Sequence, residues 1–195
     1  MRTIVMKNAK LIPANAARVF HGEIFDVYQW PQQLFDGSTA TFEMIKRDDT
    51  VTVLAVRDGK MVILKQKQPD TDDFYGIPGG RHDHEDETEL DAAKRECTEE
   101  SGMTFKNWKL VHIQQPVAKM DWFIYTFLAT DFIKEVPQKL DAGEKISVQL
   151  MTIDEIKNVI ANLSVNSRMD LPREIFDKVE TIDDLLNLPE YSDKC

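Results

Sequence analysis

The chain has 195 residues, 42% of them hydrophobic, which is enough for one domain with a substantial core. Its formal net charge of −10 argues against a long polyanion as a partner, so we expect no nucleic acid to bind. No apolar run is long enough to cross a bilayer, and residues 1–20 lack the pattern of a signal peptide. We expect no structural disulfide between Cys97 and Cys195, and therefore a cytoplasmic protein that binds no membrane.

Two β-hairpins are predicted in the first third of the chain. Residues 23–29 alternate between apolar and polar side chains, and the chain returns along residues 40–45. The second hairpin joins the apolar runs at residues 51–56 and 61–64 through Asp58-Gly59. An Asp-Gly pair is typical of a tight two-residue turn, because both central residues take positive φ there.

A helix is predicted over residues 87–101, which contain many Glu, Ala, Leu, Lys and Arg residues and no Gly or Pro. Gly102 follows as the expected C-terminal cap, since glycine readily takes the left-handed conformation. Three strands are expected next, over residues 109–113, 122–129 and 146–150.

Three further helices are predicted from their first residues. One covers residues 154–161, with Thr152 or Asp154 as its cap. Pro172 suits the first turn of a short helix, and Thr181 can cap another. The pattern indicates an α+β fold, or a mixed α/β one. We expect three parts: an N-terminal antiparallel strand unit over residues 1–48, a main domain over 49–165 and a C-terminal helical tail over 166–195.

Three glutamates share one face of the helix predicted before Gly102. Glu96, Glu99 and Glu100 stand at positions i, i+3 and i+4, and side chains with this spacing are neighbours on a helix. Such a cluster is ordinarily a solvated surface. It also offers the oxygen ligands that Mg²⁺ prefers, with Mn²⁺ as the alternative ion. We expect Gly79-Gly80 to form a loop whose Gly80 carbonyl can join these ligands.

The residues around these glutamates resemble the Nudix box. From Glu87 to Met103, including the run Arg95-Glu96-Cys97-Thr98-Glu99-Glu100-Ser101-Gly102, the spacing matches the family at every defined position. Six residues separate Gly80 from Glu87, one more than the family has, so we expect a one-residue insertion in that loop. The resemblance implies an α/β/α sandwich with a mixed sheet between helices. It also implies a hydrolase that cleaves the pyrophosphate bond of a nucleoside diphosphate linked to another group.

The same resemblance implies roles for individual residues. Glu96, Glu99, Glu100 and the Gly80 carbonyl would hold Mg²⁺, while Arg95 would orient the ligand glutamates. Glu144 would act as the general base, with Glu99 as the alternative.

Outside the box, the chain looks like the ADP-ribose pyrophosphatase subgroup over roughly residues 20–165. Residues 22–27 and 40–43 are similar to its N-terminal strand unit, which implies a homodimer, and residues 141–146 are similar to the loop that supplies the further glutamate. The tail after residue 165 has no counterpart in this resemblance.

Two positions depart from that subgroup. Gln68 stands where it has an arginine, and Gly76 stands where it has a glutamate. We expect the two lost charges to weaken any preference for ADP-ribose, with Lys65 or Lys67 as candidates to compensate.

Other functions have weaker support. A different nucleotide substrate remains open, as does an inactive Nudix-fold module that only binds a ligand. The intact glutamates favour an enzyme, because an inactive protein has no need to keep carboxylates that repel one another. The tract His82-Asp83-His84-Glu85-Asp86 is expected to be an exposed loop and not a metal site. Neither a P-loop nor a dinucleotide-binding glycine motif occurs.

Overall fold

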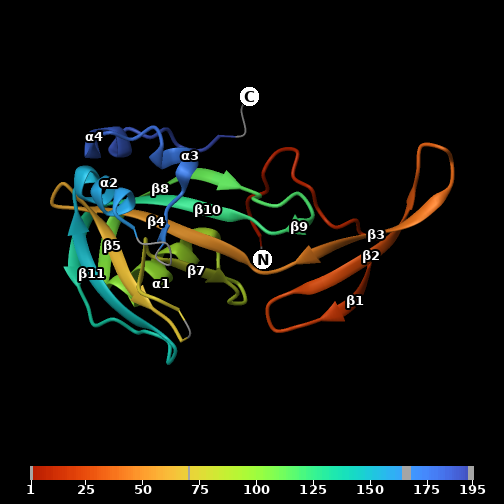
Figure 1. Ribbon diagram of the computed structural model, residues 1–195, viewed down its shortest axis with the longest axis horizontal. Coiled ribbons are helices and arrows are strands. Elements are labelled where there is room, and N and C mark those ends of the chain that lie inside the picture. The colour runs from red at the N-terminus through yellow and green to blue at the C-terminus, as the bar shows by residue number, and fades with distance from the viewer. Residues whose placement is uncertain (1, 70, 164–167, 193–195) are drawn as a thin grey trace.

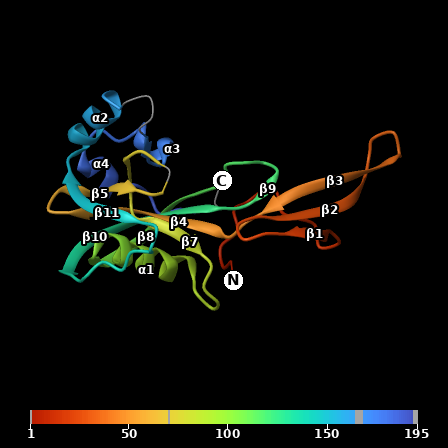
Figure 2. The same cartoon turned by 60° about the horizontal axis from the view of Figure 1, so that its bottom comes forward.

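The computed structural model describes residues 2–69, 71–163 and 168–192, which form an α/β body with a long β-arm extending from it (Figures 1 and 2). The arm consists of β1 (Ala17–His21), β2 (Asp26–Gln33) and β3 (Thr39–Lys46). Strands β2 and β3 pair antiparallel along their whole length, which confirms the first predicted hairpin. At the base of the arm, β9 (Met120–Asp121) pairs in parallel with β3.

The body is built on a mixed sheet with the strand order β12-β6-β5-β4-β10-β8, to which β11 adds beside β5 and β7 beside β4. Its strands are β4 (Asp49–Arg57), β5 (Lys60–Lys67), β6 (Phe74–Gly76), β7 (Gly79–His82), β8 (Met103–Gln114), β10 (Ile124–Glu135), β11 (Lys145–Met151) and β12 (Met169–Asp170). Strands β4 and β10 run parallel, whereas β4 and β5 form the second predicted hairpin. Its turn residues Asp58 and Gly59 take φ values of 52° and 71°, as that turn requires.

Helices cover both faces of this sheet (Figure 2). On one face lies α1 (Glu89–Ser101), and on the other lie α2 (Ile153–Ala161), α3 (Arg173–Phe176) and α4 (Ile182–Leu186). Strand β4 serves both cores because successive side chains point to opposite faces. Val53 packs in the core that contains Ala93 of α1, and Leu54 packs in the core that contains Ile156 of α2. The predicted sandwich, with a mixed sheet between helices, is confirmed.

Several predicted boundaries are wrong. Helix α1 begins at Glu89, not at residue 87, because the Thr88 hydroxyl accepts a hydrogen bond from the Asp91 N–H and caps the helix. The expected loop at Gly79-Gly80 is strand β7, which pairs with β4. A Cβ at Gly79 would lie 2.3 Å from the Val51 carbonyl oxygen, so glycine is what lets β7 approach this closely.

Two strands are longer than their local sequence predicts. Strand β8 extends the predicted segment to Met103–Gln114, and β10 starts at Ile124 and runs to Glu135. These two strands pair with each other over most of their length. Pairing between strands, which one segment's sequence does not reveal, therefore sets their ends.

The C-terminal segment packs against the body. Thr152 and Thr181 form capping boxes at α2 and α4, while Pro172 is the N-cap of α3, one position before the predicted first turn. Phe176 is buried in the core beneath α2. The predicted division of the chain at residues 48 and 165 stays a prediction.

Residues 2–4 cross the base of the arm and join four parts of the fold. The Arg2 guanidinium donates to Asp49 at 2.6 Å and to Asp121 at 2.9 Å. The Thr3 N–H donates to the buried Glu89 carboxylate at 2.5 Å, and the Tyr125 hydroxyl donates to the Ile4 carbonyl at 2.6 Å. This N-terminal segment therefore holds together β4, β9 at the base of the arm, the start of α1, and β10.

Cys97 is a buried free thiol, and Cys195 lies outside the described residues. None of the helices in the described ranges is long and apolar enough to span a membrane.

Candidate functional site

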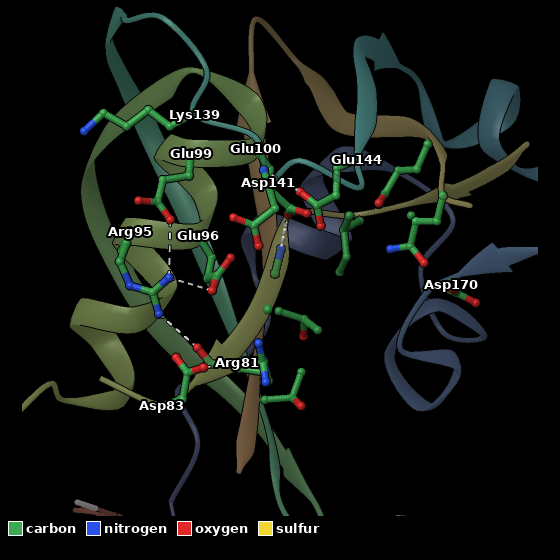
Figure 3. A pocket seen from close by; sticks show the side chains of 18 of the residues that line it. Arg81, Asp83, Arg95, Glu96, Glu99, Glu100, Lys139, Asp141, Glu144 and Asp170 are labelled. Carbon is green, nitrogen blue, oxygen red and sulfur yellow. Dashed lines mark hydrogen bonds and ion pairs between the residues drawn. The ribbon is translucent and has the colours of Figure 1, made fainter. Parts of the chain in front are cut away.

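A cavity of about 940 Å³ opens between α1, the ends of β4–β7, the loop before β11, and β12 (Figure 3). Its lining is strongly charged. The acidic lining residues are Asp83, Glu96, Glu99, Glu100, Asp141, Glu144 and Asp170. The basic ones are Arg47, Arg81, Arg95, Lys139 and Arg168. The predicted metal-binding and catalytic residues Gly80, Arg95, Glu96, Glu99, Glu100 and Glu144 thus all line one cavity.

Arg95 organises the glutamates of α1. The Arg95 Nη1 atom lies 2.6 Å from Glu96 Oε1 and 3.3 Å from Glu99 Oε2. The bidentate contact goes to Glu87, at 2.9 Å from Nε and 3.1 Å from Nη2. The expectation that Arg95 holds ligand carboxylates agrees with this geometry, and Glu87 adds a second anchor that fixes the guanidinium.

The main chain of β7 lies directly against two of these carboxylates. The Gly79 N–H donates to Glu100 Oε2 at 2.7 Å. A Cβ placed on Gly80 would lie only 2.4 Å from the Glu96 carboxyl group. A larger residue at position 80 therefore requires the Glu96 carboxyl group to move. Because the two residues are this close, the Gly80 backbone and the Glu96 side chain could hold the same ion.

The carboxylates crowd one another in a partly desolvated site. Glu100 is 7% exposed, and burial raises its pKa to about 8, with the Gly79 hydrogen bond acting against this and the charges of Glu96, Glu144 and Glu99 adding to it. Burial also raises the pKa of Glu96, against the effect of Arg95. A bound cation relieves such repulsion, and a set of carboxylate oxygens fits Mg²⁺.

Across the described ranges, no three Asp, Glu, His or Cys side chains are grouped so that they could hold a metal ion by themselves. The glutamates instead line an open cavity, which fits an ion that completes its coordination with substrate and water. Glu96, Glu99, Glu100 and the Gly80 carbonyl are the groups that could hold it. In the His82–Asp86 tract, His82 ends β7 and its ring nitrogen contacts the Glu87 carbonyl at 2.7 Å, so only residues 83–86 form the expected exposed loop.

Glu144 approaches the same carboxylates from the loop before β11. Its charge contributes to the raised pKa of Glu100, and Figure 3 shows its side chain close to Glu100 and Asp141. Glu144 Oε2 accepts a hydrogen bond from the Asp141 N–H at 3.3 Å, and no ion pair holds it within the described part of the chain. This differs from Glu99, which contacts Arg95.

Two arginines in the cavity were not predicted from the sequence. The Arg47 guanidinium lies 4.6 Å from the Trp122 ring centroid, and its buried Nε has no hydrogen-bond partner among the described residues. Burial lowers the pKa of Arg47, and the neighbouring positive charge of Arg81 lowers it further. Two adjacent guanidinium groups with an unpaired donor form a place for an anion. Arg47 follows the last strand of the arm, and Arg81 lies in β7. The two residues are far apart in the sequence, and no local motif marks either of them.

Gln66, Gln68 and Gly76 line the cavity, but Lys65 and Lys67 do not. Alternation along β5 turns the lysines to the other side, where they border a smaller cavity, and Lys65 pairs with Asp73 at 3.1 Å. The expectation that a lysine compensates for the missing charges is therefore wrong. Arg168, which precedes β12, and Asp170, which ends it, line this wall instead.

Comparisons with known proteins identify the family of the chain. The family model for the NUDIX domain matches residues 46–169. The ADP-ribose pyrophosphatase of Bacillus subtilis (strain 168) is 29% identical over 152 residues, covering 76% of this chain and 82% of that protein.

Two solved structures share the fold. An ADP compounds hydrolase has a TM-score of 0.61 at 16% identity, covering 78% of this chain and 86% of that one. A NUDIX hydrolase from Nitrosomonas europaea has a TM-score of 0.54 at 23% identity, covering 76% and 99%. Because the family model spans most of the chain and includes the glutamates of α1, the chain belongs to the Nudix family and is a hydrolase of pyrophosphate bonds.

Proposed function

We propose that this protein hydrolyses, with Mg²⁺, the pyrophosphate bond of a nucleoside diphosphate linked to a sugar, with ADP-ribose as the first candidate. One observation carries the proposal: the carboxylates of α1 and the arginines Arg47 and Arg81 line the same cavity. A diphosphate needs both, a cation held by carboxylates on one side and guanidinium donors on the other. The similarity to a protein named ADP-ribose pyrophosphatase supports the substrate class.

Glu96, Glu99, Glu100 and the Gly80 carbonyl are the proposed metal ligands. When bound, Mg²⁺ supplies positive charge that neutralises phosphate oxygens and acidifies water. Arg95 keeps Glu96 and Glu99 in position through its contacts at 2.6 and 3.3 Å, and Glu87 in turn keeps Arg95 in position. Arg95 is thus a positioning residue, and it does not bind the substrate.

Glu144 is the proposed general base. A base must accept a proton from the attacking water, and a carboxylate already paired with arginine is a weaker acceptor. Glu99 contacts Arg95 at 3.3 Å, whereas Glu144, among the described residues, accepts only a backbone N–H. Arg47 and Arg81 would bind phosphate oxygens, and the unpaired Nε of Arg47 is the donor available for this.

We further propose a homodimer formed through the arm. Strands β1–β3 project from the body, so little of the chain covers them (Figure 1). The large apolar side chains that the arm exposes are Val19, Phe20, Ile24, Phe25, Leu34, Phe35, Phe42 and Ile45. A second copy of the chain could bury this surface, which is unusually apolar for exposed strands. A cytoplasmic location stays a prediction from the sequence.

The test of the reaction is product identification. The protein is incubated with ADP-ribose, UDP- and GDP-sugars and diadenosine polyphosphates, with Mg²⁺ or with EDTA, and the products are identified by mass. We expect a nucleoside monophosphate from a nucleoside diphosphate sugar, only with Mg²⁺. Cleavage of the dinucleotides alone would favour the alternative substrate class. Binding without any cleavage would support the inactive module instead.

A further inference from the structure

Two charged residues at β12, Arg168 just before the strand and Asp170 at its end, lie in the wall of the cavity that contains the α1 glutamates. Strand β12 pairs in parallel with β6, with Met169 opposite Tyr75 and Asp170 opposite Gly76, and the Tyr75 N–H donates to the Arg168 carbonyl at 2.9 Å. Arg168 immediately precedes β12, and Asp170 is the last residue of that strand. Both line the cavity, and Arg168 lies over the ring of Phe74, with its Cζ 4.1 Å from the centroid.

Gly76 makes room for this arrangement. A Cβ at that position would lie 3.9 Å from the Asp170 Cβ and 3.1 Å from Gln66 Nε2. A side chain any longer at residue 76 would therefore compete with Asp170 and Gln66 for the same space.

Arg168 and Asp170 pair with each other, but each keeps hydrogen-bonding atoms available for a ligand. Arg168 Nε donates to Asp170 Oδ2 at 2.8 Å. Within the described residues, the Nη groups of Arg168 and the Oδ1 atom of Asp170 make no hydrogen bond. Each side chain is 56% exposed. The pair therefore presents two donor groups and one acceptor to whatever occupies this end of the cavity.

The chemistry of this wall selects a hydroxyl-bearing group. The Asp170 carboxylate repels a phosphate but accepts from hydroxyl groups, and the guanidinium of Arg168 donates to them. Phe74, the one phenyl, tyrosyl or indole ring among the described lining residues, is 5% exposed and covered by Arg168. A nucleobase thus finds no free aromatic ring here, whereas Gln66 and Gln68 add amides suited to a sugar.

We propose that Arg168 and Asp170 form the subsite for the sugar linked to the diphosphate and so determine substrate specificity. Figure 3 shows Asp170 on the far side of the cavity from Glu96 and Glu99, where a group attached beyond the phosphates would lie. The inference rests on the proposed function, because it takes the glutamate end of the cavity as the place of the phosphates.

The kinetic test compares two substrates that differ only in the sugar: ADP-ribose and the β-methyl ester of ADP. The specificity ratio is kcat/KM for ADP-ribose divided by kcat/KM for the methyl ester. We expect Asp170→Asn and Arg168→Gln each to lower this ratio about tenfold or more, as the loss of a charged hydrogen bond does. Lys157→Gln is the matched control, since Lys157 pairs with Glu180 and does not line the cavity. An unchanged ratio in both variants would overturn the proposal.

A binding measurement separates this inference from the proposed reaction. Calorimetric titrations in EDTA use ribose 5-phosphate and AMP, and thermal melting verifies that each variant is folded. We expect both variants to bind ribose 5-phosphate about tenfold more weakly and AMP as before. A loss confined to AMP would mean that the wall holds the nucleoside, and equal losses would mean a general structural effect; either overturns the sugar subsite. So would failure of the unaltered protein to bind ribose 5-phosphate. If the unaltered protein cleaves nothing, the proposed reaction fails, and these titrations still decide the subsite.

Discussion

Replacing either of the neighbouring glycines of β7 by alanine should have a different effect: loss of activity at Gly80 and loss of stability at Gly79. In Gly80→Ala the new Cβ would lie 2.4 Å from the Glu96 carboxyl group, about 1 Å closer than the 3.4 Å at which ordinary contact begins. The obstructing atoms end a flexible side chain, so the carboxylate moves and the backbone stays. A displacement of about 1 Å in a catalytic site costs about 10²-fold in rate. We therefore expect kcat to fall about a hundredfold, with the melting temperature lowered by less than about 2 °C.

Gly79→Ala should mainly lower the melting temperature. Its Cβ would lie 2.3 Å from the Val51 carbonyl oxygen and 2.9 Å from the Thr52 Cα, both in the backbone of β4. Forcing two strands apart costs about 1–3 kcal/mol, which lowers the melting temperature by about 2–12 °C in a chain of this size. Gly143→Ala is the matched control, because its Cβ would meet nothing nearer than Pro69 at 3.8 Å.

The assay combines steady-state kinetics with Mg²⁺ and thermal melting of the same three variants. The reasoning predicts that the ratio of lost activity to lost stability is largest for Gly80→Ala. If that variant keeps its kcat, or melts as low as Gly79→Ala, then β7 does not contact Glu96 as described.

Three further predictions concern the metal site, the N-terminal segment and the arm. Glu100→Gln should lower turnover about 10²-fold or more with an unchanged circular dichroism spectrum, and near-normal turnover at saturating Mg²⁺ would contradict its role as a ligand. Burial alone would raise the pKa of Glu89, but hydrogen bonds from Thr3 and Ile4 hold this pKa below its ordinary value. The Glu89 carboxylate therefore contributes its full stability above the pKa of the unfolded chain, and this stability is lost as the pH falls through the lower pKa of the folded protein. The melting temperature should therefore fall more steeply with acid in the unaltered protein than in Glu89→Gln, and parallel curves would exclude the effect. Light scattering should give twice the mass of one chain, and Phe20→Asp should halve it; a monomeric unaltered protein would rule out the dimer.

The sequence predicts features that depend on neighbours in the chain. Glu96, Glu99 and Glu100 share a helix face because of their spacing alone, and the Asp58-Gly59 turn follows from the φ values that its two residues allow.

Features that depend on distant strands could not be predicted in this way. Arg47 reaches the cavity from the link between β3 and β4, and Arg81 reaches it from β7. Arg168 reaches it from the position before a two-residue strand that no pattern marks. The direction in which Lys65 points could have been predicted from alternation, but only once the inward face of β5 was known. The departures from the family pattern at Gln68 and Gly76 indicated which part of the cavity lining would differ from the ADP-ribose pyrophosphatase subgroup. They did not indicate which residues would supply charge there instead.

The contacts of residues 2–4 also impose an order in time on folding during synthesis. Arg2 and Ile4 take partners 119 and 121 residues further along the chain, at Asp121 and Tyr125. At ribosomal rates of about 5–20 residues per second, those partners leave the ribosome about 6–24 s later than the residues that need them. For most of that interval the apolar arm is already outside the ribosome without its base in place. The N-terminal region therefore completes its fold when β10 is made and not when β1 is made, and this interval is when the nascent chain most needs protection from aggregation.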